Sequence, residues 1–215
     1  ALRLLDTGMK WLHTLEDGER AVYLHQVASV QLRQGENRQA AEALAQAEAM
    51  LRRAGHTVNR LVTAGLIGGV AFGDGDLRRA QTWNEDLLRE QTARGHWNDA
   101  ANALGNLSLI LLERGRLGEA ARAVGDAAAL AVHATRPLTA RRLASRRIHL
   151  LAQCGLLDRA EEEAGRFFPA WEATTPAAAL FVRANLGEAF FAQGRPEAGC
   201  AELRRAVTGF LATGS

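Results

Sequence analysis

A glycine recurs at intervals of 40 residues along most of this 215-residue chain. Gly35, Gly75, Gly115 and Gly155 share one phase, and Gly194 falls one residue short of the next step. A fixed period of this length is the signature of a repeat architecture, in which each unit packs against its sequence neighbours. The sequence therefore predicts one motif repeated along the chain.

Small residues share the phase of these glycines. Larger apolar residues at three- and four-residue spacing, such as Leu104, Leu107 and Leu111, indicate helices. Small side chains let two antiparallel helices approach closely, while the larger ones fill the sides. The small set lies five residues after each glycine (Ala40, Ala80, Ala120, Ala160 and Gly199) and seven residues before it (Ala28, Gly68, Ser108 and Gly187, with Ile148 the exception). Each repeat is thus predicted to be two helices joined by a turn, as in residues 101–131 around Gly115.

The repeat phase predicts an all-α protein. We expect a single solenoid domain over residues 1–215, with no strands. An N-terminal helix is predicted over residues 1–15, and its helical pattern stops at Asp17-Gly18. Five helix-turn-helix repeats follow. The repeats span approximately residues 19–54, 58–94, 98–133, 137–173 and 175–211.

Composition excludes several kinds of chemistry. Lys10 is the only lysine, and no glycine-rich phosphate loop precedes it, so a phosphate-loop site is excluded and a Schiff-base site has this one candidate. Cys154 and Cys200 lack the spacing of a zinc site or a disulfide framework, which favours a reducing, cytoplasmic setting. Asp74 and Asp76 flank a turn glycine, but the rest of a calcium loop is missing. The sequence predicts no catalytic residues, no cofactor, no metal ion and no membrane-spanning segment.

Two stretches resemble the tetratricopeptide repeat: NLGEAFFAQGRPEAG at residues 185–199 and LGNLSLILLERGRLGEAARAV at residues 104–124. That repeat is a 34-residue helix-turn-helix with small residues at its helix crossings. The resemblance implies an α-solenoid coiled as a right-handed superhelix. It also implies a non-enzymatic scaffold that binds a protein or peptide segment in a concave groove.

The period here exceeds that of the family by about six residues. Long, alanine-rich repeats of this kind are similar to the helical arms of MalT-like LuxR-type bacterial regulators. This narrower resemblance implies an alternative function, an effector-sensing or interaction arm of a larger bacterial transcriptional regulator that binds a small molecule.

In the family, the first helix of each repeat lines the groove. One subset, Asn106, Arg142 and Arg146, matches three of the five places at which chaperone-binding members hold a peptide's terminal carboxylate; the other two places are Gly65 and Gly69 here. The implied partner therefore carries an acidic or C-terminal carboxylate group. The groove residues implied by the register are His25, Gln26, Ser29 and Arg33 in the first repeat, Asn102 and Asn106 in the third, Arg142, Arg146 and His149 in the fourth, and Asn185 and Glu188 in the fifth.

Two alternatives stay open. The stretch RRLASRR at residues 141–147 is equally typical of a solvated helix face, with no ligand. Direct nucleic-acid binding is not expected, because the net charge is only +2 and no aromatic residues interleave with the arginines. Val207, Phe210 and Leu211 in the last helix lack a following polar cap, which predicts contact with a second copy, as a homodimer, or with a continuation of the chain.

Overall fold

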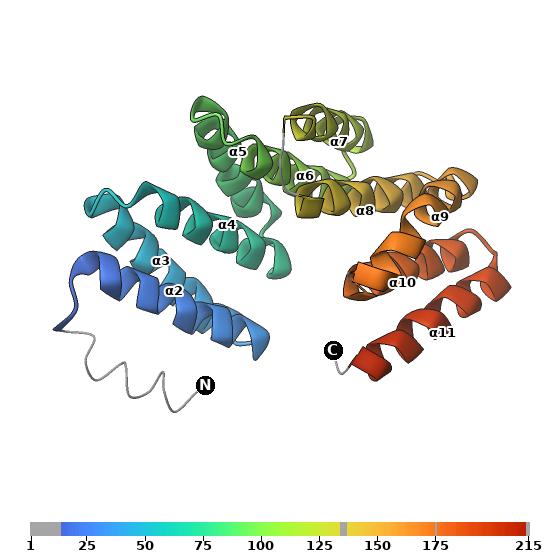
Figure 1. Cartoon of the computed structure of the whole chain (residues 1–215), viewed down its shortest axis with the longest axis horizontal. Coiled ribbons are helices and arrows are strands. Elements are labelled where there is room, and N and C mark those ends of the chain that lie inside the picture. Colours follow the sequence, from blue (N-terminus) through green and yellow to red (C-terminus); the bar gives the residue numbers. More distant parts are fainter. Residues whose placement is uncertain (1–13, 134–136, 175, 214–215) are drawn as a thin grey trace. The chain divides into compact units, whose positions relative to one another are not determined.

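The computed structural model describes residues 14–133, 137–174 and 176–213. The described residues form helices joined by short turns, with no strand among them (Figure 1). The helix predicted over residues 1–15 lies almost entirely outside the described residues. The helices are α2 (Asp17–Arg33), α3 (Asn37–Arg53), α4 (Thr57–Gly73), α5 (Leu77–Ala93), α6 (Trp97–Glu113), α7 (Leu117–Ala131), α8 (Pro137–Gln153), α9 (Leu157–Thr174), α10 (Pro176–Ala192) and α11 (Pro196–Thr213). The predicted all-α class is confirmed.

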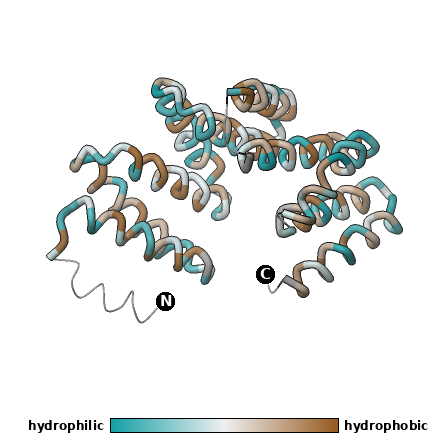
Figure 2. The backbone as a smooth tube through the Cα atoms, viewed as in Figure 1, coloured by the Kyte–Doolittle hydropathy of each residue, from teal (hydrophilic) through white to brown (hydrophobic). Residues whose placement is uncertain are grey.

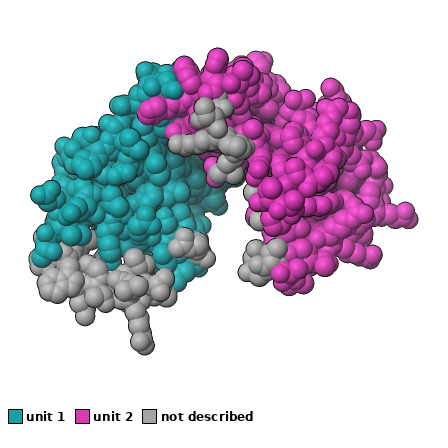
Figure 3. Space-filling model, viewed as in Figure 1, with its two compact units in different colours: residues 1–95 teal, residues 96–215 magenta. Residues whose placement is uncertain are grey.

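The chain divides into two compact units, Ala1–Gly95 and His96–Ser215 (Figure 3). In unit 1, α2 packs with α3, α3 with α4, and α4 with α5. In unit 2, α6 packs with α7 and α10 with α11, while α8 contacts α6, α7, α9 and α10. The side-by-side packing of α6, α8 and α10 positions the candidate site described below.

The turn glycines end their helices by one mechanism, seen clearly at Gly115. This glycine has φ +71°, a left-handed conformation that side chains disfavour. Its N–H donates to the Leu112 carbonyl, and the N–H of Arg116 donates to the Leu111 carbonyl, both at 2.8 Å. These two bonds form a Schellman motif. The same positive φ occurs between repeats at Gly55 and Gly95, so the turns recur at half of the 40-residue period.

Close helix approach explains the small residues that share the glycine phase. Ala40, Ala80, Ala120 and Ala160 are all fully buried. In the last pair of helices, a β-carbon added to Gly199 would stand 2.9 Å from the Gly187 carbonyl oxygen. The prediction that small residues mark the crossings is therefore confirmed.

Each unit has its own apolar core. Leu44, Leu51 and Ile67 lie in the cluster of unit 1, and Trp171 and Phe190 lie in that of unit 2. Apolar residues recur along the helices, interleaved with polar ones (Figure 2). Burying a large apolar side chain contributes about 1.5–3 kcal/mol. Among the described helices, none combines the length and the apolar character needed to cross a membrane.

The start of α2 differs from the sequence expectation. The sequence predicts that Asp17 and Gly18 separate two helices, whereas α2 begins at Asp17. Glu16 and Glu19 form a reciprocal capping box there, with the Glu16 N–H donating to Glu19 Oε2 at 3.3 Å. This pair satisfies N-terminal backbone donors, so the helix starts before the glycine.

Candidate functional site

Arg146, on α8, is a half-buried cation without an acidic partner. Its Nη2 donates to Asn106 Oδ1 on α6 at 2.5 Å. Its Nε and Nη1 are buried and have no hydrogen-bond partner. Among the described residues, no carboxylate forms an ion pair with it. Because burying an unpaired charge is costly, a guanidinium in this state requires an explanation.

Gly105 on α6 makes room for this side chain. A β-carbon added to Gly105 would stand 2.9 Å from Arg146 Nη1 and 3.0 Å from its Cδ. The guanidinium therefore lies against bare backbone, where α6 and α8 pack together. A larger residue at position 105 would require Arg146 and the adjacent Leu143 to shift.

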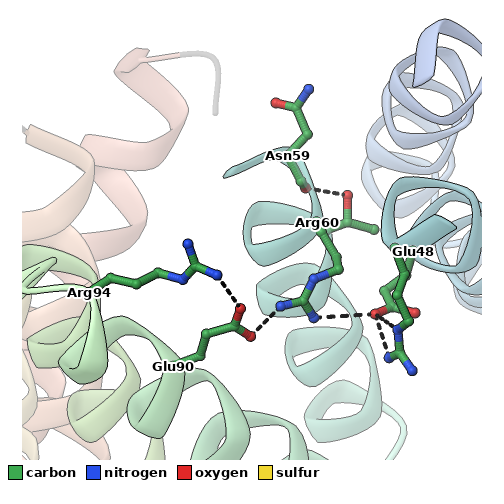
Figure 4. Close-up of polar contacts among 7 residues, drawn as sticks. Glu48, Asn59, Arg60, Glu90 and Arg94 are labelled. Atoms are coloured by element: carbon green, nitrogen blue, oxygen red, sulfur yellow. Dashed lines mark hydrogen bonds and ion pairs between the residues drawn. The ribbon is translucent and has the colours of Figure 1, made fainter. Parts of the chain in front are cut away.

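Two other largely buried arginines, Arg60 and Arg183, form ion pairs with glutamates. Arg60 on α4, only 18% exposed, lies between Glu48 on α3 and Glu90 on α5, and Arg94 binds Glu90 at 3.1 Å (Figure 4). Hydrogen bonding to Glu90 raises the pKa of Arg60, and the bond from Arg60 lowers the pKa of Glu90. These ion pairs link α3, α4 and α5, so they hold the helices of unit 1 together.

Arg183 on α10 shows the same pattern in unit 2. It is 14% exposed and pairs with Glu172 at 2.5 Å and with Glu202 at 2.7 Å. Its guanidinium carbon also lies 4.1 Å from the centre of the Phe168 ring. Arg146 thus differs from both Arg60 and Arg183 in having only an amide oxygen as partner.

Two further buried polar atoms on α6 and α8 lack partners, Oδ1 of Asn102 and Nδ1 of His149. Asn102 lies one turn before Asn106 on α6, and His149 lies three residues after Arg146 on α8, so each shares a helix face with its neighbour. The four residues Asn102, Asn106, Arg146 and His149 are hereafter the α6–α8 cluster.

Arg146 supplies the positive charge of the α6–α8 cluster. Burial, with a smaller effect of the neighbouring Arg142 charge, lowers the pKa of Arg146 to about 10, so the side chain remains protonated at neutral pH. Burial also lowers the pKa of His149, against the opposing charges of Glu113 and Glu188. A ligand oxyanion would supply Arg146 with a negative charge and with acceptors for its Nε and Nη1, which have none.

The structure places the predicted groove residues in different settings. Asn106 and Arg146 are hydrogen-bonded to each other, Asn102 and His149 lie about one turn from them on α6 and α8, and Arg142 lies exposed one turn before Arg146. The solvated-face alternative therefore describes Arg142 but is wrong for Arg146, whose Nε and Nη1 are buried. On α10, Asn185 is half-buried and Glu188 is exposed.

The candidates from the first repeat lie in unit 1, apart from the α6–α8 cluster in the sequence. The Nδ1 of His25 lies 3.0 Å from Thr63 Oγ1, and Ser29 Oγ donates to the His25 carbonyl at 3.0 Å. Gln26 is exposed, and the side chain of Arg33 lies outside the described residues. The polar atoms of His25 and Ser29 thus have intramolecular partners, unlike those of the cluster.

Sequence reasoning missed an open hollow in unit 1, with a volume of about 680 Å³. Leu61, Trp83 and Leu87 are among the apolar residues that line it, and Arg60 and Glu90 lie at its polar side. Its charges are already paired within the protein. No group of three or more histidine, cysteine or acidic residues in the described parts of the chain is arranged to hold a metal ion.

No protein-family model and no curated protein sequence matches the chain. Solved structures do match it over most of its length. The BtubC (BKLC) structure from P. vanneervenii has a TM-score of 0.70 at 16% identity, covering 99% of this chain and 89% of its own. A kinesin light chain with nearly identical TPR-like repeats, from Podosopora anserina, has a TM-score of 0.63 at 16% identity, over 93% and 99%. The fold is that of TPR-like helical repeats.

Two further matches are parts of longer proteins. A Rap protein complexed with Competence and Sporulation Factor has a TM-score of 0.74 at 16% identity, covering 95% of this chain and 68% of that one. A STAND protein with a tetratricopeptide repeat sensor, from Pyrococcus horikoshii, has a TM-score of 0.68 at 14% identity, with coverage of 96% and 32%. At these identities the likeness establishes the fold, including the predicted solenoid of TPR-like repeats, and nothing about ligands.

Proposed function

We propose that this chain is a non-enzymatic binding scaffold for a protein or peptide segment that carries a carboxylate. The segment binds across α6 and α8, and the α6–α8 cluster receives the carboxylate. The observation that carries this proposal is the buried Arg146, whose Nε and Nη1 have no acceptor while its Nη2 bonds only to an amide oxygen.

The chemistry of the cluster supports a carboxylate over a neutral group. A guanidinium presents its N–H donors in a fork that matches two carboxylate oxygens. To reach Arg146, the carboxylate takes the place of the Asn106 oxygen or draws the guanidinium outward from Gly105. Arg142, exposed one turn away on α8, adds a second positive charge at the entrance.

A short peptide tests the proposal. The probe is the acetylated pentapeptide Ser-Leu-Gly-Ser-Asp, compared with a form amidated at its C-terminus and a form with Asn in place of Asp. These arms separate a terminal from a side-chain carboxylate. We expect Arg146→Met to weaken binding of the parent peptide at least about tenfold in calorimetry, the size expected for a hydrogen bond to a charged group.

Arg147→Met is the matched control for this measurement. Arg147 lies on the same helix, but its Nε pairs with Glu163 at 3.0 Å. We expect this variant to keep the parent affinity. Equal affinities for wild type and Arg146→Met, or equal loss in both variants, would contradict the proposal.

A second candidate function is the sensor arm of a larger regulator, with a small organic acid as effector. The likeness to the STAND protein's tetratricopeptide repeat sensor supports it, because this chain covers only a third of that protein. Titration with small monocarboxylic acids separates the two functions. Binding of an acid much tighter than any peptide would favour the sensor arm.

Self-association through the C-terminal helix stays a prediction. Leu211 on α11 is 80% exposed and Val207 is also exposed, while Phe210 packs partly against Phe181. Light scattering of wild type and of Leu211→Glu tests it. A concentration-dependent dimer that the charged variant abolishes would support the homodimer, and a monomeric wild type would contradict it.

A further inference from the structure

Phe181 on α10 is an exposed aromatic side chain with 62% of its surface accessible. Its ring forms a T-shaped pair with that of the half-buried Phe210 of α11, with ring centres 5.3 Å apart and an interplanar angle of 72°. An edge-to-face pair leaves one aromatic face open to a further apolar group. We refer to these two residues as the aromatic pair.

The aromatic pair lies in register with the α6–α8 cluster. Phe181 is the sixth residue of α10, Arg142 is the sixth of α8, and Asn102 is the sixth of α6. Because α8 packs against both α6 and α10, equivalent positions of these three helices are expected to lie side by side. Asn185, one turn after Phe181, occupies the position of Arg146 on the neighbouring helix.

The helix that carries Phe181 packs closely against its neighbours. On its buried side, Leu180 packs so closely on α11 that a β-carbon at Gly209 would stand 2.3 Å from Leu180 Cδ2. Arg183 ties α10 to both α9 and α11 through Glu172 and Glu202. The backbone that carries Phe181 is therefore positioned before any ligand arrives, which reduces the entropy lost on binding.

We infer that the aromatic pair receives an apolar side chain of the same partner segment whose carboxylate binds the α6–α8 cluster. This inference rests on the proposed function. Packed helices lie about 8–10 Å apart, and an extended chain advances about 3.3–3.6 Å per residue. Phe181 also lies four positions, or about 6 Å, before the position of Arg146 along the helix direction. The apolar side chain therefore stands about three residues from the carboxylate. The partner class is an acidic segment with one nearby leucine-like or aromatic anchor.

Two changes, one in the peptide and one in the protein, test the inference. The peptide is again acetylated Ser-Leu-Gly-Ser-Asp, in which the Leu stands three residues from the terminal Asp, compared with the form carrying Ser in place of Leu. On the wild-type protein, we expect the loss of Leu to weaken binding about tenfold, as for burial of one apolar side chain. On Phe181→Ser, we expect both peptides to bind equally, at the weaker level.

The outcomes separate this inference from the proposed function. If amidation or Arg146→Met weakens binding but the Leu-to-Ser change has the same effect on wild type and on Phe181→Ser, the inference is overturned and the function stands. If Phe181→Ser instead dissociates a dimer and leaves peptide affinity unchanged, the occupant is a second copy and the inference is also overturned. Failure of every peptide to bind at millimolar concentration overturns both.

Leu211→Ser is the matched control for Phe181→Ser. Leu211 is also exposed and apolar, and it follows Phe210 on the last turns of α11, but it is not a member of the aromatic pair. Its replacement removes a similar apolar area, and we expect it to leave the discrimination between the two peptides unchanged. Loss of that discrimination in Leu211→Ser as well would show that general apolar area, and not the aromatic pair, is responsible, and would overturn the inference.

Discussion

The side chain of Arg146 lies directly over Gly105. Its Nη1 and Cδ occupy space within 3.0 Å of where a β-carbon on Gly105 would stand. The position of the Arg146 side chain on α8 thus requires that residue 105 on α6 have no side chain. The candidate site exists because a glycine in α6 faces an arginine in α8.

Replacement of Gly105 by Ala should displace Arg146 toward solvent. We expect the free energy of unfolding to change by less than about 1 kcal/mol, because alanine's better helix propensity offsets the strain. The readout is the Arg146 Nε–H resonance in NMR, whose hydrogen exchange should accelerate once the buried Nε reaches water. An unchanged exchange rate would show that the side chain keeps its place.

Replacement of Arg146 by Met should stabilise the unliganded protein. It removes a buried charge that has no ionic partner and leaves an apolar chain of similar length. Exchanges of buried charges for packed apolar residues stabilise by about 1–4 kcal/mol, and we expect the lower end because Arg146 is only partly buried. Denaturant unfolding measures the change. A destabilised Arg146→Met variant would indicate that the guanidinium supports the fold.

Replacement of Arg60 by Met should have the opposite effect. It leaves Glu48, which is 8% exposed, and Glu90 without the cation that joins them. The loss of charged hydrogen bonds is expected to lower the free energy of unfolding by about 1.5–3 kcal/mol. The same unfolding measurement checks it, and the opposite signs for Arg60 and Arg146 form the critical comparison. Equal signs would contradict the distinction between a structural and a ligand-binding arginine.

Stability should fall in mildly acidic solution through His25 and His149. In the unfolded chain, a histidine side chain has a pKa of about 6.5. Burial lowers the pKa of both side chains in the folded state. Between the folded and unfolded pKa values, the unfolded chain binds more protons, so stability increases with pH there. The contribution is complete above about pH 6.5 and is lost as the pH falls through the folded pKa.

The double variant with Gln at positions 25 and 149 should flatten this dependence. Urea unfolding at several values between about pH 5 and about pH 7.5 gives the slope for both proteins. Carboxylates titrate mostly at lower pH, so the difference between the two slopes reports the histidines. Identical slopes would contradict the prediction.

Much of the fold was readable from the sequence because its determinants are local. The turn at Gly115 requires a left-handed residue, and the small residues Ala120 and Ser108 mark the crossing on each side of it. The start of α2 was harder to predict, since the capping box of Glu16 and Glu19 outweighs a glycine in the first turn.

The candidate site was only partly readable. The repeat register singles out Asn106, Arg142 and Arg146 together, and the structure does join Asn106 to Arg146. In the last repeat, Phe181 occupies the position that Arg142 has in the repeat before. The register therefore also indicates Phe181 as a groove residue, but the groove prediction omits it. The network of Arg60 leaves no sequence signal, because its partners lie 12 residues before it and 30 after it.

The sequence by itself determined the helices, their turns and the repeated packing, because backbone conformation and apolar spacing act over a few residues. Only the tertiary structure decided the state of each arginine in RRLASRR. Arg142 is exposed, Arg147 pairs with Glu163, and Arg146 lies buried over Gly105 without an acid. The physical reason is that a charge's solvation and partners depend on the neighbouring helices, which local sequence does not specify.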